Sequence, residues 1–228
     1  MAILADPVYR YDDERLGARL STNPSDWPQR DAVIAQLGRL PYTRREAQAV
    51  LAAADAAVSW LAEGFDASRE SATKTSWDRF SLVHFATHAL LNERHPELSG
   101  IVLSLYAPDG HAIDGFLRIN DIYQLRMPVE LIVLSVCDSA SGQELGAEGP
   151  ASLARAFFYA GSHRVLASLW PVDDRATATL MEDFYRSLLV ERQSASEALR
   201  SAQREVARDP RWAQPYYWAG FVLEGDWG

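Results

Sequence analysis

The chain has 228 residues, 48% of them hydrophobic and 23% charged, which is the balance of a globular protein and excludes disordered and collagen-like classes. Its 22 Lys and Arg against 31 Asp and Glu give a net charge of -9. Nucleic acid and anionic membranes are therefore not expected as partners, because binding to either depends on clustered cations. A single cysteine, Cys137, excludes an internal disulfide, a cysteine-rich zinc site and an iron–sulfur cluster, and it favours a reducing compartment.

The chain carries no sign of a membrane span or a leader. No apolar run approaches the ~18 residues of a transmembrane helix, and the opening MAILADPVYR lacks the layout of a signal peptide. We therefore expect a cytoplasmic protein. No internal repeat and no long Pro, Gly or Ser linker divides the chain, so a single domain over residues 1–228 is the simplest organisation.

Short, β-branched-rich apolar runs predict the strands. In chain order they cover residues 2–5, 58–62, 82–87, 101–105, 131–136, 165–169 and 216–223. Longer stretches of helical period alternate with them, at residues 42–54, 150–160, from 173 onward, and 194–207. This alternation predicts an α/β protein with a mostly parallel sheet covered by helices.

The ends of three helices are marked by capping residues. Pro150 stands at the first position of one helix and Gly161 follows its last residue. Asp173 and Asp174 open the next, where acidic residues favour the positive end of a helix. Ser194 with a glutamate three residues later predicts a capping box.

Two of the predicted strands end in residues capable of nucleophilic catalysis. HFATHA ends one with His88, and LSVCDSASG ends another with Cys137. In open parallel sheets, sites form beyond the carboxyl ends of the strands, so a thiol and an imidazole meet there if the strands are neighbours. The alternative is that Cys137 is a small buried hydrophobe, which is the usual role of a lone cysteine after an apolar run.

The other histidines are assigned no catalytic role. His84 lies four residues before His88 on the same strand, so both face one side, and we expect His84 to be a core residue. The remaining three have no spacing that suggests a metal site, so neither a metal nor another cofactor is expected; they are His95, His111 and His163.

Six separated blocks carry a further signal through their order and spacing. They are LADPVYRYDDERL, LPYTRREAQAV, HFATHALLNERHPELSGIVLS, LIVLSVCDSASG, GAEGPASLARAFFYAGSHRVLASLWPVDDRATATLMEDFYR and PYYWAGFVLEGDW. Together they resemble the CHAT domain, a caspase-like peptidase domain of bacteria that usually follows tetratricopeptide repeats. The resemblance implies a caspase-like three-layer α/β/α sandwich. It also implies a cysteine endopeptidase that cleaves a protein substrate through an acyl-enzyme intermediate.

On the matching positions, the resemblance makes His88 the general acid/base and Cys137 the nucleophile. It implies an oxyanion hole made by the backbone N–H groups of Ala89 and Cys137. Ala89 departs from the family, which usually has glycine after the histidine. If that glycine has a positive φ, Ala89 is strained and activity is weakened. The alternative function is therefore a catalytically silent caspase-like module that acts as a protein-binding scaffold.

The loop of residues 168–174 is the expected wall of the substrate pocket, by the same resemblance. Trp170 there offers a surface for an apolar residue or for the peptide. Asp173 or Asp174 would make the pocket anionic and favour Arg or Lys before the cut bond. The alternative is that these aspartates only cap the following helix, in which case the pocket is apolar.

Regulation is expected to come from outside this chain. No Lys or Arg lies between Arg126 and Arg155, so an enzyme that cuts after basic residues does not activate itself just after Cys137. A regulatory tetratricopeptide-repeat region or an activator protein is the expected partner.

Overall fold

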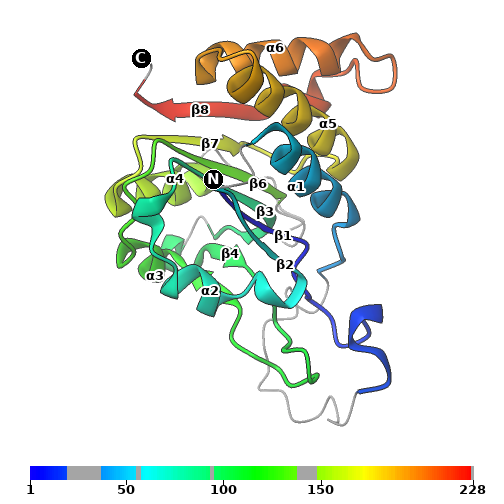
Figure 1. Ribbon diagram of the computed structural model, residues 1–228, viewed down its shortest axis with the longest axis vertical. Coiled ribbons are helices and arrows are strands. Elements are labelled where there is room, and N and C mark those ends of the chain that lie inside the picture. Colours follow the sequence, from blue (N-terminus) through cyan, green and yellow to red (C-terminus); the bar gives the residue numbers. More distant parts are fainter. Residues whose placement is uncertain (20–36, 55–57, 93–94, 138–147, 227–228) are drawn as a thin grey trace.

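The structure is a computed structural model that describes residues 1–19, 37–54, 58–92, 95–137 and 148–226. Its centre is an eight-stranded sheet with the strand order β2-β1-β3-β6-β7-β8, to which β4 and β5 are added on β3 (Figure 1). The strands are β1 (Ala2–Ala5), β2 (Trp60–Glu63), β3 (Leu82–Leu90), β4 (Gly100–Val102), β5 (Phe116–Arg118), β6 (Leu131–Cys137), β7 (Arg164–Ser168) and β8 (Phe221–Gly225).

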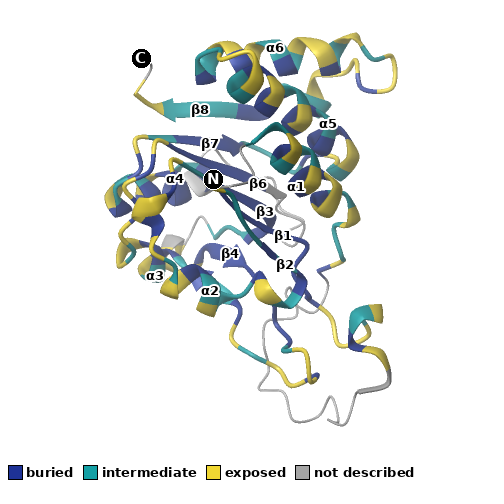
Figure 2. Ribbon diagram, viewed as in Figure 1, coloured by how far each residue is buried: buried dark blue, intermediate teal, exposed yellow. Residues whose placement is uncertain are grey.

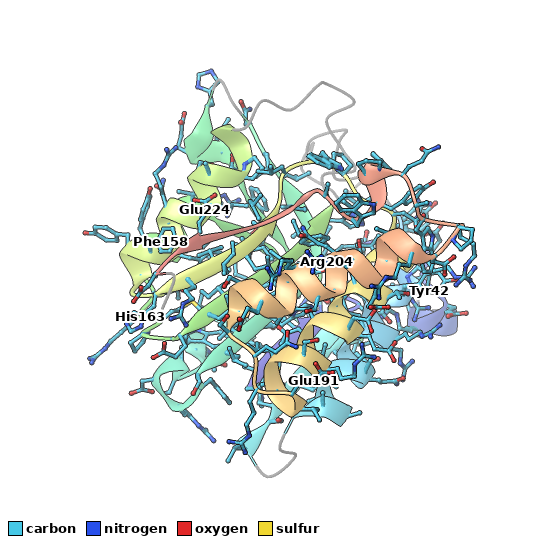
Figure 3. All side chains as sticks on the ribbon, turned by 90° about the horizontal axis from the view of Figure 1, so that it is seen from above. Tyr42, Phe158, His163, Glu191, Arg204 and Glu224 are labelled. Carbon is cyan, nitrogen blue, oxygen red and sulfur yellow. The ribbon has the colours of Figure 1, made fainter. Side chains whose placement is uncertain are left out.

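Helices cover both faces of this sheet. One layer contains α1 (Pro41–Ala53), α5 (Asp174–Tyr185) and α6 (Ala195–Arg208), and the other contains α2 (Arg69–Lys74), α3 (Ile119–Tyr123) and α4 (Glu148–Ala160). Figure 3 looks down on the β8 edge of the sheet, where α6 with Arg204 and α4 with Phe158 lie on the two sides of the strand that carries Glu224. The predicted three-layer α/β/α sandwich with a mostly parallel sheet is confirmed.

Short turns of other helix types join these elements. They are the 3-10 turns Glu14–Arg19, Gly64–Asp66, Trp77–Arg79, Pro96–Leu98 and Pro215–Tyr217, and a π-helical turn at Arg186–Val190. Within the described ranges, no helix is both long and apolar enough to cross a membrane.

The two larger of three hydrophobic clusters lie on opposite faces of the sheet, and β3 contributes to both. Val83 and Phe85 face the core that includes Phe157 of α4, and the ring centroids of Phe85 and Phe157 are 5.6 Å apart. Ala86, of the opposite parity, belongs to the core that includes Phe184 of α5. Every residue from Val83 to Ala89 is buried, which Figure 2 shows as dark blue along the middle strands.

Strand β3 has a change of neighbour near its carboxyl end. Its first half pairs in parallel with β1, up to Ala5 opposite Ala86. Its last three residues pair antiparallel with β4, and the first of these pairs is His88 opposite Val102. Along its other edge, β3 pairs in parallel with β6 from Leu82 to His88. The end of β3 is therefore the point where segments from β1, β4 and β6 converge.

Three of the four predicted helix ends are confirmed, whereas α4 begins at Glu148, so that Pro150 is its third residue and not its first as predicted. Gly161 follows α4 with φ +113°, a conformation that favours glycine. Asp173 caps α5 by accepting a hydrogen bond of 2.8 Å from the N–H of Ala176. Ser194 and Glu197 form the capping box of α6.

Several predicted strands are wrong in extent. Strand β2 begins at Trp60, two residues after the predicted start, and β3 continues to Leu90, three residues past the predicted end. The last strand begins at Phe221 and not at Tyr216, because Pro215 opens a 3-10 turn. The carbonyl of Tyr216 accepts a hydrogen bond of 3.0 Å from Trp170 Nε1. The strand predicted at residues 101–105 ends at Val102. Beyond Val102, the N–H groups of the next three residues, 103–105, donate to carbonyls in three different segments, those of Gly115, Ala67 and Val8. The ladder of hydrogen bonds with one partner strand therefore does not continue.

Candidate functional site

The candidate site begins with the pairing of His88 and Cys137. These two residues are directly opposite each other, as Cα partners in the parallel pair of β3 and β6. They are also the final paired residues of that ladder, at the carboxyl ends of both strands. The condition set for the site, that the two strands are neighbours, is thus met. The loop that follows Cys137, residues 138–147, lies outside the described part of the chain.

The imidazole of His88 is buried and oriented. The residue is 1% exposed, and the ring of Tyr9 lies against it with a centroid separation of 4.8 Å. The Nε2 atom is 2.7 Å from the carbonyl oxygen of Gly38. Because a carbonyl only accepts hydrogen bonds, this contact places the ring proton on Nε2 and makes Nδ1 the basic nitrogen of the neutral ring.

Tyr9 is held in place by a chain of hydroxyl groups. Its hydroxyl is 2.7 Å from Thr87 Oγ1, and the Thr87 hydroxyl in turn donates to the carbonyl of Val102 on β4. Burial raises the pKa of Tyr9, although its hydrogen bonds with Thr87 Oγ1 and with the backbone of His88 oppose this. The phenol therefore stays protonated and neutral, and it acts as a packing wall for His88.

A charged cavity of about 300 Å³ lies beside Tyr9. Six residues line it: Tyr9, Arg10, Asp12, Asp13, Glu14 and Arg39. Sequence reasoning assigned these residues no role, although all but Arg39 lie in the first of the six family-like blocks.

Ala89 lies in an ordinary strand conformation. It pairs antiparallel with Ile101 of β4. Among the described non-glycine residues, only Asp6 and Arg192 have a positive φ. The strain considered for an alanine at this position is therefore absent.

The three expected substrate-binding residues lie at the neighbouring strand end, after β7. Trp170 donates its Nε1–H to Tyr216, and its ring packs against Gly220, where an added Cβ would come within 3.0 Å of it. Asp173 is the cap of α5, as the alternative interpretation held. Asp174 accepts a hydrogen bond of 3.1 Å from the N–H of Tyr42 on α1.

Asp174 is electrostatically unusual for a residue at a helix start. Burial raises its pKa to about 6. The hydrogen bond from Tyr42 opposes this rise, and the nearby carboxylates of Glu46, Asp173 and Asp6 add to it. The carboxylates of Glu46, Asp173 and Asp6 therefore repel that of Asp174.

His84 lies in the core, as expected, within a buried polar group on the α1 and α5 side. Its Nδ1 is 2.9 Å from the hydroxyl of Tyr185, and its Nε2 is 2.9 Å from Glu46 Oε1. His84 and Glu46 are fully buried, and their close approach lacks hydrogen-bond alignment, so it is an electrostatic contact. Burial raises the pKa of Tyr185, which keeps its hydroxyl protonated.

Within the described residues, no group of three or more His, Cys, Asp or Glu side chains is arranged to hold a metal ion.

Two mammalian proteins match about half of the chain, and a family model matches nearly all of it. The chain is 37% identical to human tetratricopeptide repeat protein 28 over 126 residues, which are 52% of this chain and 5% of that protein. The mouse protein of the same name is 40% identical over 109 residues, which are 48% of this chain and 4% of that protein. The chain thus spans only about a twentieth of the length of these relatives. Both are mammalian, so they give no support to the expected bacterial origin.

A family model gives the broader match. The model of the CHAT domain covers residues 9–226, which include Tyr9, His88, Cys137 and the last strand. The chain therefore belongs to the CHAT domain family.

Proposed function

We propose that this protein is a caspase-like cysteine endopeptidase of the cytoplasm, with His88 and Cys137 as its dyad. The observation that carries the proposal is that the two residues end neighbouring parallel strands as direct partners, with the imidazole already oriented by Gly38. A reducing compartment keeps the one cysteine as a thiol.

The reaction uses the basic nitrogen of His88. The thiol proton of Cys137 passes to Nδ1, and the thiolate attacks the carbonyl carbon of the substrate peptide. The carbon–nitrogen bond then breaks, the imidazolium gives its proton to the leaving amine, and an acyl-enzyme remains on sulfur. Water, deprotonated by the same imidazole, hydrolyses this thioester and restores the thiol.

The oxyanion of each tetrahedral intermediate is assigned to the backbone N–H groups of Ala89 and Cys137. Backbone donors at such a position stabilise the developing charge, and each is worth roughly 3 kcal/mol in related chemistry. An alanine in strand conformation keeps the same donor that a glycine would supply.

We propose Trp170, Asp173 and Asp174 as substrate contacts. Their position after β7, the neighbour of β6, supports this assignment. Asp173 and Asp174 already accept backbone hydrogen bonds, so Trp170 has the strongest case of the three. The relatives named tetratricopeptide repeat proteins support regulation by a repeat region or an activator protein.

The test compares peptide cleavage by the purified chain with that by Cys137→Ala and His88→Ala. A mixed peptide library is incubated with each protein, and new termini are read by mass spectrometry. His95→Ala is the matched control, because His95 is exposed and its imidazole lies beside the exposed Glu97. Cuts made by the unmodified chain and by the control, but by neither dyad variant, are expected. Cuts that persist in Cys137→Ala would overturn the assignment.

The second candidate function is a scaffold that binds a protein partner without cleaving it. An exposed aromatic pair favours it: Tyr159 on α4 is 75% exposed and lies edge-on to Tyr123 of α3 at 5.2 Å between centroids. A folded chain that makes no cuts, and whose Cys137 reacts with iodoacetamide no faster than a free thiol, would favour this function.

A further inference from the structure

The carbonyl that orients His88 belongs to a short segment laid across the end of β3. We call residues 37–40 the strap. Leu37 is 1% exposed and packs with Val8 and Tyr9. Gly38 accepts the hydrogen bond from His88. Beyond it, the carbonyl of Leu40 accepts from Thr43 Oγ1 at 2.7 Å.

Arg39 fixes the middle of the strap. Its Nε and Nη2 atoms donate to the two carboxylate oxygens of Asp6, at 2.9 and 2.8 Å. Its Nη1 donates to Glu14 at 2.5 Å. The hydrogen bonds to Asp6 are the main cause of the raised pKa of Arg39, so the guanidinium is charged at any working pH. Such a two-pronged contact fixes orientation as well as distance.

Asp6 is itself held from several directions. It follows β1 directly, has φ +48° and is 1% exposed. Its N–H donates to Thr43 Oγ1 at 3.2 Å, and Arg15 Nη1 donates to its carbonyl at 2.7 Å and lies 3.1 Å from its carboxylate. A buried carboxylate with these partners is a rigid anchor, because leaving it unpaired would be costly.

The anchor and the histidine are neighbours in the sheet. Ala5 is opposite Ala86, so Asp6 is one residue past β1 at the level of Thr87, next to His88. The peptide bond between Gly38 and Arg39 therefore links a fixed ion pair to the ring of His88. A movement of Arg39 is transmitted to the carbonyl one residue before it.

We propose that Arg39, clamped by Asp6, is a positioning residue that sets the tautomer and orientation of His88 through the carbonyl of Gly38. This rests on the proposed function, since it gives His88 the basic Nδ1 that the dyad reaction needs. When the clamp is removed, the strap keeps its ties at Leu37 and Leu40, but the Gly38 carbonyl loses its fixed position. The proton then distributes between Nδ1 and Nε2, and the fraction of His88 ready to accept the thiol proton falls.

The experiment reads the tautomer directly, without relying on peptidase activity. Long-range ¹H–¹⁵N correlation spectra of the ¹⁵N-labelled chain report which imidazole nitrogen carries the proton, and His88→Gln identifies the His88 signals. Arg39→Ala is compared with Arg39→Lys and Asp6→Asn. Asparagine tolerates the positive φ of position 6 and removes only the charge, so this variant is the one expected to keep the fold. Arg39→Lys keeps a charge without the two-pronged geometry.

The matched control is Arg10→Ala. Arg10 lines the same cavity and makes an equally short two-pronged contact, at 2.7 Å twice, but with Asp12 instead of Asp6. Thermal unfolding of each variant confirms that the spectra report folded protein.

The expected result is a single Nε2–H tautomer of His88 in the unmodified chain and in Arg10→Ala. Mixed tautomers are expected in Arg39→Ala and Asp6→Asn, with Arg39→Lys between. Where cleavage is measurable, kcat falls by about 10- to 100-fold and KM is unchanged. An unchanged His88 tautomer in folded Arg39→Ala and Asp6→Asn would overturn the inference, even in an active peptidase. A changed tautomer in a chain that cuts nothing would leave the inference standing and refute the proposed function instead.

Discussion

Substituting Asp174 by asparagine is expected to stabilise the protein above pH 6. The carboxylate opens α5, yet it is largely buried between α1 and α5, and burial raises its pKa from 3.8 to about 6. Asparagine removes the charge and keeps an oxygen that accepts the hydrogen bond from the N–H of Tyr42. The neighbouring acids, Glu46, Asp173 and Asp6, lose a repelling partner at the same time.

The size of the effect follows from the raised pKa. A rise from 3.8 to about 6 converts to about 3 kcal/mol at about 1.4 kcal/mol per pKa unit. Because the side chain is partly exposed to solvent, we discount this to about 1–2 kcal/mol. The folded state binds the proton more tightly than the unfolded state. The stability contribution of Asp174 is therefore complete below pH 3.8 and is lost as the pH rises through about 6.

The assay is urea unfolding of both proteins at pH 4 and pH 8. Asp174→Asn is expected to gain about 1–2 kcal/mol at pH 8, or about 2 to 8 °C in Tm, and to gain nothing at pH 4. Asp66→Asn is the control, because Asp66 is an exposed acid in a 3-10 turn. An equal gain at both pH values, or no gain at pH 8, would refute the reasoning.

Three further substitutions test other parts of the structure. Glu46→Ala leaves the fully buried imidazole of His84 without its carboxylate neighbour and is expected to cost about 1–3 kcal/mol in urea unfolding; adding His84→Leu should recover part of this loss, and no recovery would speak against the pairing. Ser194→Ala removes the cap of α6 and is expected to cost about 1 kcal/mol, seen as a lower urea midpoint, whereas an unchanged midpoint would argue against the capping box. Ala89→Gly relieves no strain and is expected to cost about 0.5–1 kcal/mol without any gain in peptide cleavage, so a rise in cleavage would contradict the strand conformation described for Ala89.

The parts of the fold that depend on local signals were predictable from the sequence. Gly161 and Ser194 mark helix ends by their own chemistry, and the structure confirms both. The placement of His88 and Cys137 at the same edge of the sheet was predictable as well, because parallel strands bring their carboxyl ends to one edge. That their two strands are direct neighbours was left open by the sequence and is seen only in the structure. The assignment of these residues as a catalytic dyad stays a prediction.

The surroundings of His88 were not predictable, because they depend on contacts between distant segments. Gly38 is 50 residues from His88 along the chain, and Arg39 is 33 residues from Asp6. No periodicity or spacing rule relates such pairs. Every residue also has a backbone carbonyl, so the residue type of Gly38 does not indicate that its carbonyl contacts His88.

The last strand shows a different limit. The alternating aromatic residues from Tyr216 have the pattern of a strand, but Pro215 favours a turn. The carbonyl of Tyr216 also accepts a hydrogen bond from the indole of Trp170. Tertiary contacts here outweighed strand propensity, as they commonly do for short aromatic runs.

The buried His84 has a consequence for how the sheet assembles. Strand β3 is buried on both faces, so the burial pattern alone distinguishes poorly between its correct alignment and one shifted by a single residue. A shift of one residue would turn His84 away from Glu46 and Tyr185 and into the aromatic core of Phe85 and Phe157. That misalignment would bury an imidazole without partners, which is energetically unfavourable. One polar residue thus selects the alignment that also sets His88 opposite Cys137.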